Sequence, residues 1–231
     1  TLIESLRHQL FDPQSNNLSV PFTGGALGYI SYELGYQLES IIHCEKPQGL
    51  PLPDLMFGFY DWALLVDNKN DQIYLVVHKT KDQTTELQIF WQSRFDWLMR
   101  QCEEKPVKTS FKLNSNWSSN LSKKTYTEKF NNIQNYILNG DCYQVNLTQR
   151  FAADYQGDEY QAYIALLEDN RPPFAAFLRF PSQSILSLSP ERFLKLDNGI
   201  VETKPIKGTY PRFKDKKQDN QSRQRLIDSE K

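Results

Sequence analysis

Four short runs of β-forming residues follow one another near the C-terminal end of the chain, and they constrain the fold more than any other feature. The last two runs are separated by Asn198-Gly199, a strong signal for a two-residue hairpin turn. Helical and β-type segments are mixed along the chain without strict βαβ alternation, so we expect mainly antiparallel sheets with helices packed outside, an α+β fold. The four runs are PFAAFLRF from Pro173, SILSLS from Ser184, ERFLKLD from Glu191 and IVETKPI from Ile200.

Further strands are predicted upstream. The polar run from Asp67 to Asp71 separates WALLV from IYLVV, as the loop of a hairpin does. A strand is also expected after Pro21, and because Gly24 to Gly28 lead into a strand and not a helix, close strand packing is favoured over a phosphate-binding loop. CYQVNLTQRF, from Cys142, alternates apolar and polar residues and predicts a strand with one face of each kind.

Helices are predicted where apolar residues recur at helical spacing. One covers residues 84–102, a second begins after the N-cap Ser122 and ends at Gly140, and a third covers residues 158–169. The two end segments, TLIESLRHQLF and QSRQRLIDSEK, also have helical composition. Since the first lacks an initiating methionine and the second lacks a stop signal, we expect a piece of a longer polypeptide.

The polar segment 106–121, rich in Asn and Ser, is the best candidate for a linker. It predicts an N-terminal part at residues 1–105, with mixed strands and helices, and a C-terminal part at residues 122–231.

Charge and cysteine content exclude several classes of protein. The 27 basic and 28 acidic residues nearly cancel, so nothing favours a nucleic-acid partner. No apolar run approaches the roughly 20 residues that a membrane span needs. The three cysteines are odd in number and widely spaced, which is typical of a reducing compartment and predicts a cytoplasmic location.

Glu191 and Lys207 form the candidate catalytic pair. A two-residue turn at Asn198-Gly199 sets Lys195 opposite Glu202, a pair of opposite charges, and Glu191 opposite Ile206. Strict alternation places Glu191 and Lys207 on opposite faces. Pro205 favours a bulge or strand end, and a one-residue slip would bring Lys207 to the side of Glu191.

The residue pattern alone leaves two readings of this pair open. Neighbouring carboxylates and lysines on strands are mostly surface ion pairs worth about 0–1 kcal/mol, and the pattern favours that reading. The alternative is a buried lysine nucleophile beside a general acid, with its pKa lowered from about 10.4 so that free amine exists at neutral pH.

Six blocks, in order, show a resemblance to a known family. PFTGGALGYISYELG, YDWALLVD, NGDCYQVNLTQRF, FAAFLRF, LSLSPERF and TKPIKGTYPR resemble the chorismate-utilising enzymes, from about Pro21 to Lys231. The resemblance implies that the chain forms part of the anthranilate synthase-like α/β/β/α fold. The matching motif of anthranilate synthases is PIAGT, whereas aminodeoxychorismate synthases that use a lysine nucleophile have PIKGT, as found here around Lys207.

The resemblance assigns roles to individual residues. Lys207 is implied as the nucleophile that adds to C2 of chorismate, and Glu191 of SPERF as the general acid and base. Gly208 and Thr209 match the substrate-side turn. Pro173 and Phe174 fall where related enzymes shape a tryptophan effector pocket. The implied product is 4-amino-4-deoxychorismate, a precursor of 4-aminobenzoate and folate.

The family also implies partners that the chain does not itself carry. One is Mg²⁺, held by glutamates that lie beyond the point matching Lys231, so no metal ligand is expected in this chain. The other is a glutamine amidotransferase subunit that supplies ammonia. We therefore expect little or no activity from the chain alone. The alternatives are an anthranilate synthase component I activity and a non-catalytic fragment that docks an amidotransferase or binds tryptophan.

Overall fold

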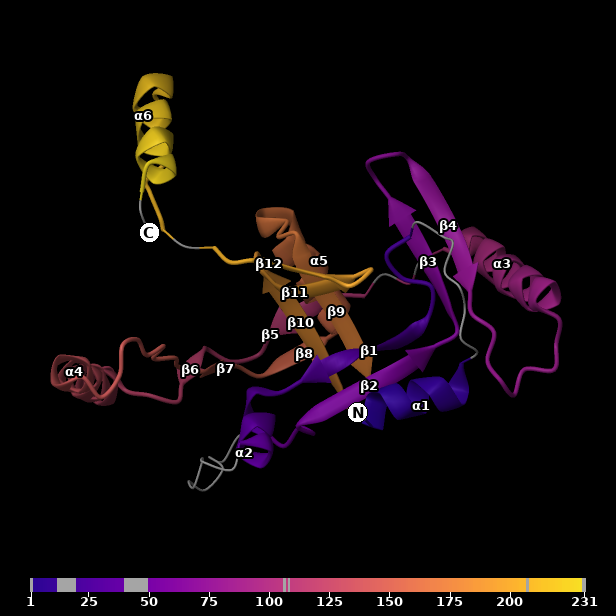
Figure 1. Ribbon diagram of the computed structural model, residues 1–231, viewed down its shortest axis with the longest axis horizontal. Coiled ribbons are helices and arrows are strands. Elements are labelled where there is room, and N and C mark those ends of the chain that lie inside the picture. The colour runs from indigo at the N-terminus through magenta and orange to yellow at the C-terminus, as the bar shows by residue number, and fades with distance from the viewer. Residues whose placement is uncertain are drawn as a thin grey trace. The chain divides into compact units, whose positions relative to one another are not determined.

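The computed structural model describes residues 2–11, 20–39, 50–105, 107, 109–206 and 208–229. The chain divides into two compact units, Thr1–Val107 and Lys108–Lys231. In the described residues every strand pairing is antiparallel, and helices accompany the strands in both units, which confirms the predicted α+β class (Figure 1).

The first unit consists of two strand pairs and their helices. Its elements are α1 (Leu2–Leu10), β1 (Gly25–Ile30), the 3-10 helix η1 (Tyr32–Leu34), α2 (Gly35–Leu38), β2 (Leu55–Tyr60), β3 (Trp62–Asp67), β4 (Gln72–Val77) and α3 (Leu87–Glu103). β1 pairs with β2, and β3 pairs with β4 through the predicted hairpin loop. The indole N–H of Trp91 on α3 donates to the carbonyl of Leu75 on β4 at 3.0 Å, which ties the helix to the hairpin.

The glycine-rich run of this unit lies in a strand, as predicted. A Cβ added to Gly28 would lie 2.0 Å from the carbonyl oxygen of Met56 on the neighbouring strand, so the close approach of β1 and β2 requires glycine there. The interpretation as strand packing is therefore confirmed. Phe11, 3% exposed, and Val76, 8% exposed, are the buried apolar side chains among the described residues.

The second unit contains the candidate site. Its elements are β5 (Phe111–Leu113), β6 (Ser118–Ser119), α4 (Lys123–Asn139), β7 (Phe151–Ala152), β8 (Tyr155–Gly157), α5 (Glu159–Asn170), β9 (Phe174–Phe180), β10 (Gln183–Ser189), β11 (Arg192–Asp197), β12 (Ile200–Lys204) and α6 (Lys216–Ile227). α5 packs on the β9–β10 pair, where the rings of Tyr160 and Tyr163 contact Phe177 at centroid distances of 5.2 and 5.5 Å.

The predicted ends of α4 are confirmed. The Ser122 hydroxyl accepts the backbone N–H of Thr125 at 3.1 Å, as an N-cap does. Gly140 closes the helix with a left-handed φ of 81°, a conformation that glycine adopts at little cost.

One segment differs from the sequence prediction. The strand expected at residues 142–151 is wrong for all but its last residue, since the backbone is irregular over residues 142–150 and β7 begins only at Phe151. On the predicted apolar face, Tyr143 is 95% exposed and Val145 is 44% exposed, so most of that face is not packed against a neighbour in the described residues. Within the predicted linker 106–121, β5 pairs with β8 and β6 pairs with β7. The domain boundaries as such stay a prediction.

Candidate active site

Glu191 lies at the junction between β10 and β11. Pro190 ends β10, and the Ser189 hydroxyl then accepts the N–H of Glu191 at 3.2 Å and donates to its carbonyl oxygen at 3.1 Å. These two bonds fix the backbone of Glu191. Its side chain is exposed, and its Oε1 accepts the backbone N–H of Ile206 at 3.2 Å. The carboxylate therefore lies against the backbone of the residue that precedes Lys207 in sequence.

The hairpin register explains this contact. Asn198 and Gly199 both have positive φ, 49° and 79°, and the predicted pairs Asp197–Ile200, Leu196–Val201 and Lys195–Glu202 are confirmed. Beyond Lys195 the register shifts by one residue, because the next recorded pair joins Arg192 to Lys204.

The shift is a β-bulge on β11. Phe193 and Leu194 together oppose the single residue Thr203, so the extra residue lies on β11 and not at Pro205, where the sequence had favoured it. The register that set Glu191 opposite Ile206 is wrong by one residue. The ladder ends at Arg192 and Lys204, and the Glu191 side chain reaches the Ile206 N–H from beyond that end.

The other predicted catalytic and substrate-binding residues are Lys207, Gly208 and Thr209, which are consecutive in sequence. Lys207 itself is outside the described residues. Gly208 has a φ of 84°, which a side chain with a Cβ rarely adopts, and Thr209 is exposed. A Cβ on Gly208 would lie 3.2 Å from the Leu226 methyl group on α6, so α6 packs near this turn.

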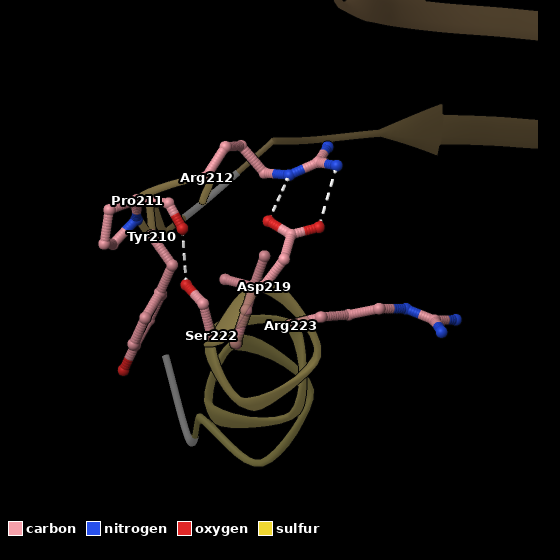
Figure 2. Close-up of a pocket in the computed structure, with 7 residues that line it drawn as sticks. Tyr210, Pro211, Arg212, Asp219, Ser222 and Arg223 are labelled. Atoms are coloured by element: carbon pink, nitrogen blue, oxygen red, sulfur yellow. Dashed lines mark hydrogen bonds and ion pairs between the residues drawn. The ribbon is translucent and has the colours of Figure 1, made fainter. Parts of the chain in front are cut away.

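The residues that directly follow this turn in sequence line a pocket. It has a volume of about 420 Å³ and lies between residues 210–212 and α6 (Figure 2). Arg212 and Asp219 form a two-point ion pair across it, with N–O distances of 2.8 and 3.0 Å. The Ser222 hydroxyl donates to the Pro211 carbonyl at 2.5 Å. The Arg212–Asp219 hydrogen bonds lower the pKa of the Asp219 carboxyl and raise the pKa of Arg212. Both groups are therefore charged, and each is bound to the other.

The predicted effector residues lie at the start of β9. Pro173 is exposed, and Phe174 is half-buried and pairs with Ser189 at the end of β10. A pocket of about 400 Å³ lies beside them, lined by Ile164, Leu167, Glu168, Arg171, Pro172 and Ala175, which flank Pro173 and Phe174 without including them. A role for Pro173 and Phe174 in binding tryptophan stays a prediction.

The ionic contacts of the hairpin differ from those predicted. Lys195 pairs with Asp197 at 2.7 Å instead of with Glu202, although its backbone is opposite Glu202. Glu202 pairs with Arg192, and its other oxygen lies 3.4 Å from the Lys204 ammonium. Desolvation raises the pKa of the Glu202 carboxyl, but the charge of Lys204 and the hydrogen bonds from Lys204 and Arg192 outweigh it and lower the pKa below its ordinary value.

Sequence reasoning missed Arg192. Its guanidinium carbon lies 4.9 Å from the Phe174 ring centroid, so the residue that directly follows Glu191 contacts a predicted effector position. The bulge causes this arrangement, since it pairs Arg192 with Lys204 and places it within reach of Glu202. A sequence signal was present in the alternating charges of β12, Glu202 and Lys204, which offered Arg192 a partner.

The described residues do not offer a magnesium site. Among them, no group of three or more His, Cys, Asp or Glu side chains is arranged to hold a metal ion. The donor set around Glu191 therefore does not fit a magnesium ion. Of the cysteines in the described ranges, Cys102 and Cys142 are free thiols. In those ranges, no helix is both long and apolar enough for a membrane crossing.

Comparison with known proteins defines the class of protein. Residues 1–231 match the chorismate binding enzyme family. The chain belongs to this family, and the resemblance noted in the sequence is confirmed. A crystal structure of anthranilate synthase component I from Streptococcus pneumoniae matches with a TM-score of 0.78 at 21% identity, over 99% of this chain and 50% of that one. This likeness confirms the fold as anthranilate synthase-like.

Individual relatives narrow the class. The chain is 45% identical over 221 residues to aminodeoxychorismate synthase component 1 of Salmonella typhimurium, covering 96% of this chain and 46% of that protein. The corresponding protein of Escherichia coli is 43% identical over 217 residues, covering 94% and 45%. Anthranilate synthase component 1 of Lactococcus lactis is more distant, 30% identical over 214 residues, covering 91% and 46%. The chain spans about half the length of these curated relatives.

Proposed function

We propose that this chain carries the nucleophile and the general acid of an aminodeoxychorismate synthase large component, which converts chorismate and ammonia to 4-amino-4-deoxychorismate. The observation that supports it is the contact between the Glu191 carboxylate and the Ile206 N–H, one residue before Lys207 in the KPIKGT motif. The higher identity to aminodeoxychorismate synthases than to anthranilate synthases, 45% against 30%, points the same way.

The first step is the displacement of the C4 hydroxyl. The neutral amine of Lys207 forms a bond to C2 of chorismate, the ring double bonds shift, and the C4–O bond breaks. Hydroxide is a poor leaving group, so Glu191 as a carboxylic acid gives its proton to this oxygen and the product is water. The lysine is then joined covalently to the ring, and Glu191 is a carboxylate.

The second step reverses the pattern of bonds. Ammonia forms a bond to C4, the double bonds shift back, and the C2–N bond to Lys207 breaks. Glu191 takes up the proton that the new ammonium group loses. Two displacements through a covalent intermediate replace one difficult direct exchange of hydroxyl for amine.

The exposure of Glu191 suits both steps. A general acid must reach the leaving oxygen within hydrogen-bond distance, and the exposed carboxyl, held by a backbone N–H at 3.2 Å, keeps its second oxygen for a substrate. Gly208 and Thr209 supply the neighbouring turn. Gly208 has a positive φ that favours glycine, which leaves the backbone there uncovered by a side chain. The Thr209 hydroxyl offers a hydrogen bond to substrate.

Partners complete the proposal. The relatives are named component 1, which implies a second component; we propose a glutamine amidotransferase that delivers ammonia. A magnesium ion that binds the substrate carboxylates through residues outside those described stays a prediction, as does a cytoplasmic location. The 231-residue chain by itself is predicted to have little or no activity.

The test is product analysis with the complete protein. Incubation with chorismate and ammonium should give aminodeoxychorismate by mass spectrometry. Lys207→Ala should lower the rate at least 100-fold and remove the chorismate-derived adduct from the intact-protein mass spectrum, because the nucleophile is lost. Lys195→Ala is the matched control, since this lysine lies on β11 and pairs with Asp197; it should keep the rate.

Three outcomes would contradict the proposal. Anthranilate as the main product would assign the chain to the sister activity. A Lys207→Ala variant with full activity would remove the nucleophile role. No product of either kind from the complete protein, together with binding of tryptophan in calorimetry, would favour a non-catalytic module.

A further inference from the structure

Arg192 contacts both β9 and β12, and the proposed mechanism gives this residue no role. Its side chain is 28% exposed, and it forms an ion pair with Glu202 on β12. Its guanidinium carbon is 4.9 Å from the centroid of Phe174, the first residue of β9. One face of the guanidinium therefore contacts an aromatic ring on one strand pair, while its Nη1 binds a carboxylate on the other.

The two strand pairs meet at Glu191. Phe174 pairs with Ser189 in the β9–β10 ladder, and Arg192 pairs with Lys204 in the β11–β12 hairpin. Glu191 is in the connection between these ladders, with its backbone held by the Ser189 hydroxyl. Arg192 thus bridges both ends of the short connection that carries the carboxyl.

Glu191 is otherwise weakly restrained. Its side chain is exposed, and within the described part of the chain the recorded hydrogen bond to its carboxylate comes from one neutral donor, the Ile206 N–H at 3.2 Å. A neutral hydrogen bond at the surface competes with water and does not by itself hold a flexible carboxyl in one place. The Ile206 N–H can meet the carboxylate only while β12 keeps its place relative to Glu191, and the Arg192–Glu202 pair ties β12 to that place.

We propose that Arg192 is a positioning residue: by binding Glu202 and covering Phe174, it holds the Glu191 carboxyl against the Ile206 N–H. This inference rests on the catalytic role proposed for Glu191, but its geometric part stands without it. Lysine does not replace arginine here, because a compact ammonium cannot bind Glu202 and at the same time present a planar face to the Phe174 ring.

The geometric part is tested by NMR on the complete protein labelled with ¹⁵N-isoleucine. The Ile206 amide signal, assigned with Ile206→Val, should move on acidification as the carboxylate that accepts its N–H is protonated. Glu191→Gln should abolish this movement. In Arg192→Lys and Arg192→Ala the movement should shrink to less than half. An unchanged movement in both Arg192 variants would overturn the inference.

Arg179→Lys is the matched control. Arg179 also lies over a phenylalanine, with its guanidinium carbon 5.1 Å from the Phe177 centroid, and it also pairs with an acid, Asp158. It lies on β9, away from the Glu191 connection. Its variant should keep the Ile206 response, so a loss in Arg192→Lys alone reports position and not a general loosening of the unit.

Activity provides the second readout. Arg192→Lys should lower kcat on the order of 10–100-fold, the effect of a misplaced catalytic group, with KM changed less than about threefold. A merely structural role would lower the amount of folded enzyme and leave its pH profile unchanged; the inference expects the alkaline limb of the kcat profile, on which a general acid loses its proton, to move. An unchanged kcat and pH profile would contradict it.

The two proposals fail separately. If Glu191→Gln keeps full activity while the Ile206 response still depends on Arg192, the catalytic role of Glu191 falls and the positioning contact stands. If Glu191→Gln is inactive and Arg192→Lys keeps both readouts, the catalytic role stands and the positioning role falls. Phe174→Leu, which keeps the apolar contact but removes the aromatic face, should give a smaller loss in the same direction as Arg192→Lys.

Discussion

The β9–β10 pair and the β11–β12 hairpin are neighbours in sequence but are stabilised in different ways. β9 and β10 are half-buried along almost their whole length, pair over seven residues without a shift, and have α5 packed on them. β11 and β12 are mostly exposed, are joined by a tight turn and contain a bulge. Glu191 lies between the two.

The two strand pairs therefore contribute differently to the position of Glu191. The β9–β10 pair is supported by its unbroken ladder and by the packing of half-buried side chains against α5, and Ser189 lies at its end. The hairpin is held by its turn and by ion pairs, so its far end, at Glu191 and Ile206, is adjusted by local contacts such as Arg192–Glu202. A catalytic carboxyl at such a junction has a rigid base on one side and an adjustable partner on the other.

The largest expected effect is on packing at β9. Phe177→Ala removes a half-buried ring that contacts Tyr160 and Tyr163 and should destabilise the protein by about 2–4 kcal/mol. Phe193→Ala on β11 removes a ring that is 83% exposed and should change stability by less than about 0.5 kcal/mol. Urea unfolding measures both. Equal losses would show that the two strand pairs are supported alike.

An intermediate effect is expected at the hairpin turn. Gly199 has a φ of 79°, so Gly199→Ala places a Cβ in the left-handed region at a cost of about 1–2 kcal/mol. Gly157 also has a positive φ, 103°, but a Cβ there would clash with the Ser110 carbonyl, so a substitution at Gly157 is not a suitable control. Asn198→Asp is the control instead, because aspartate adopts the same turn conformation. It should cost less than the alanine. A stable Gly199→Ala variant would mean that the ion pairs, and not the turn, hold the hairpin.

The elements predicted correctly from the sequence are those that depend on only a few neighbouring residues. The Ser122 and Gly140 caps and the Asn198-Gly199 turn each depend on one or two side chains or φ values, and each was readable from the sequence. The strand expected at Cys142 failed because alternation only shows that a segment can lie at a surface, whereas a strand also needs a neighbour to pair with.

The candidate site shows the same limit. Glu191 was predicted from its motif, but the hairpin register that set it opposite Ile206 was wrong by one residue. The position of the bulge did not follow, because it depends on how Phe193 and Leu194 fit against Thr203. Arg192 became visible only with that bulge, since its contacts with Phe174 and Glu202 come from two different ladders.

The smallest expected effect compares the acids that serve the two strand pairs. Asp158 caps α5, and its pKa is lowered first by the Tyr160 N–H, with Arg179 and Thr109 assisting; the Glu202 pKa is lowered by Lys204 and Arg192 against desolvation. A carboxyl with a lowered pKa in the folded state stabilises it above the ordinary pKa, near 4, and this contribution is lost as the pH falls below that value.

The fall in stability between about pH 5 and pH 2 should therefore be shallower in Asp158→Asn and in Glu202→Gln than in the wild type. Because exposed ion pairs are screened, the effect of Glu202→Gln should largely disappear in 1 M salt. The effect of Asp158→Asn should persist, since the largest cause there is a hydrogen bond from the backbone. Urea unfolding across this pH range at low and high salt measures both. Equal sensitivity to salt would mean that Asp158, too, acts through its charge on Arg179, and that the helix on β9–β10 is held no more rigidly than the hairpin.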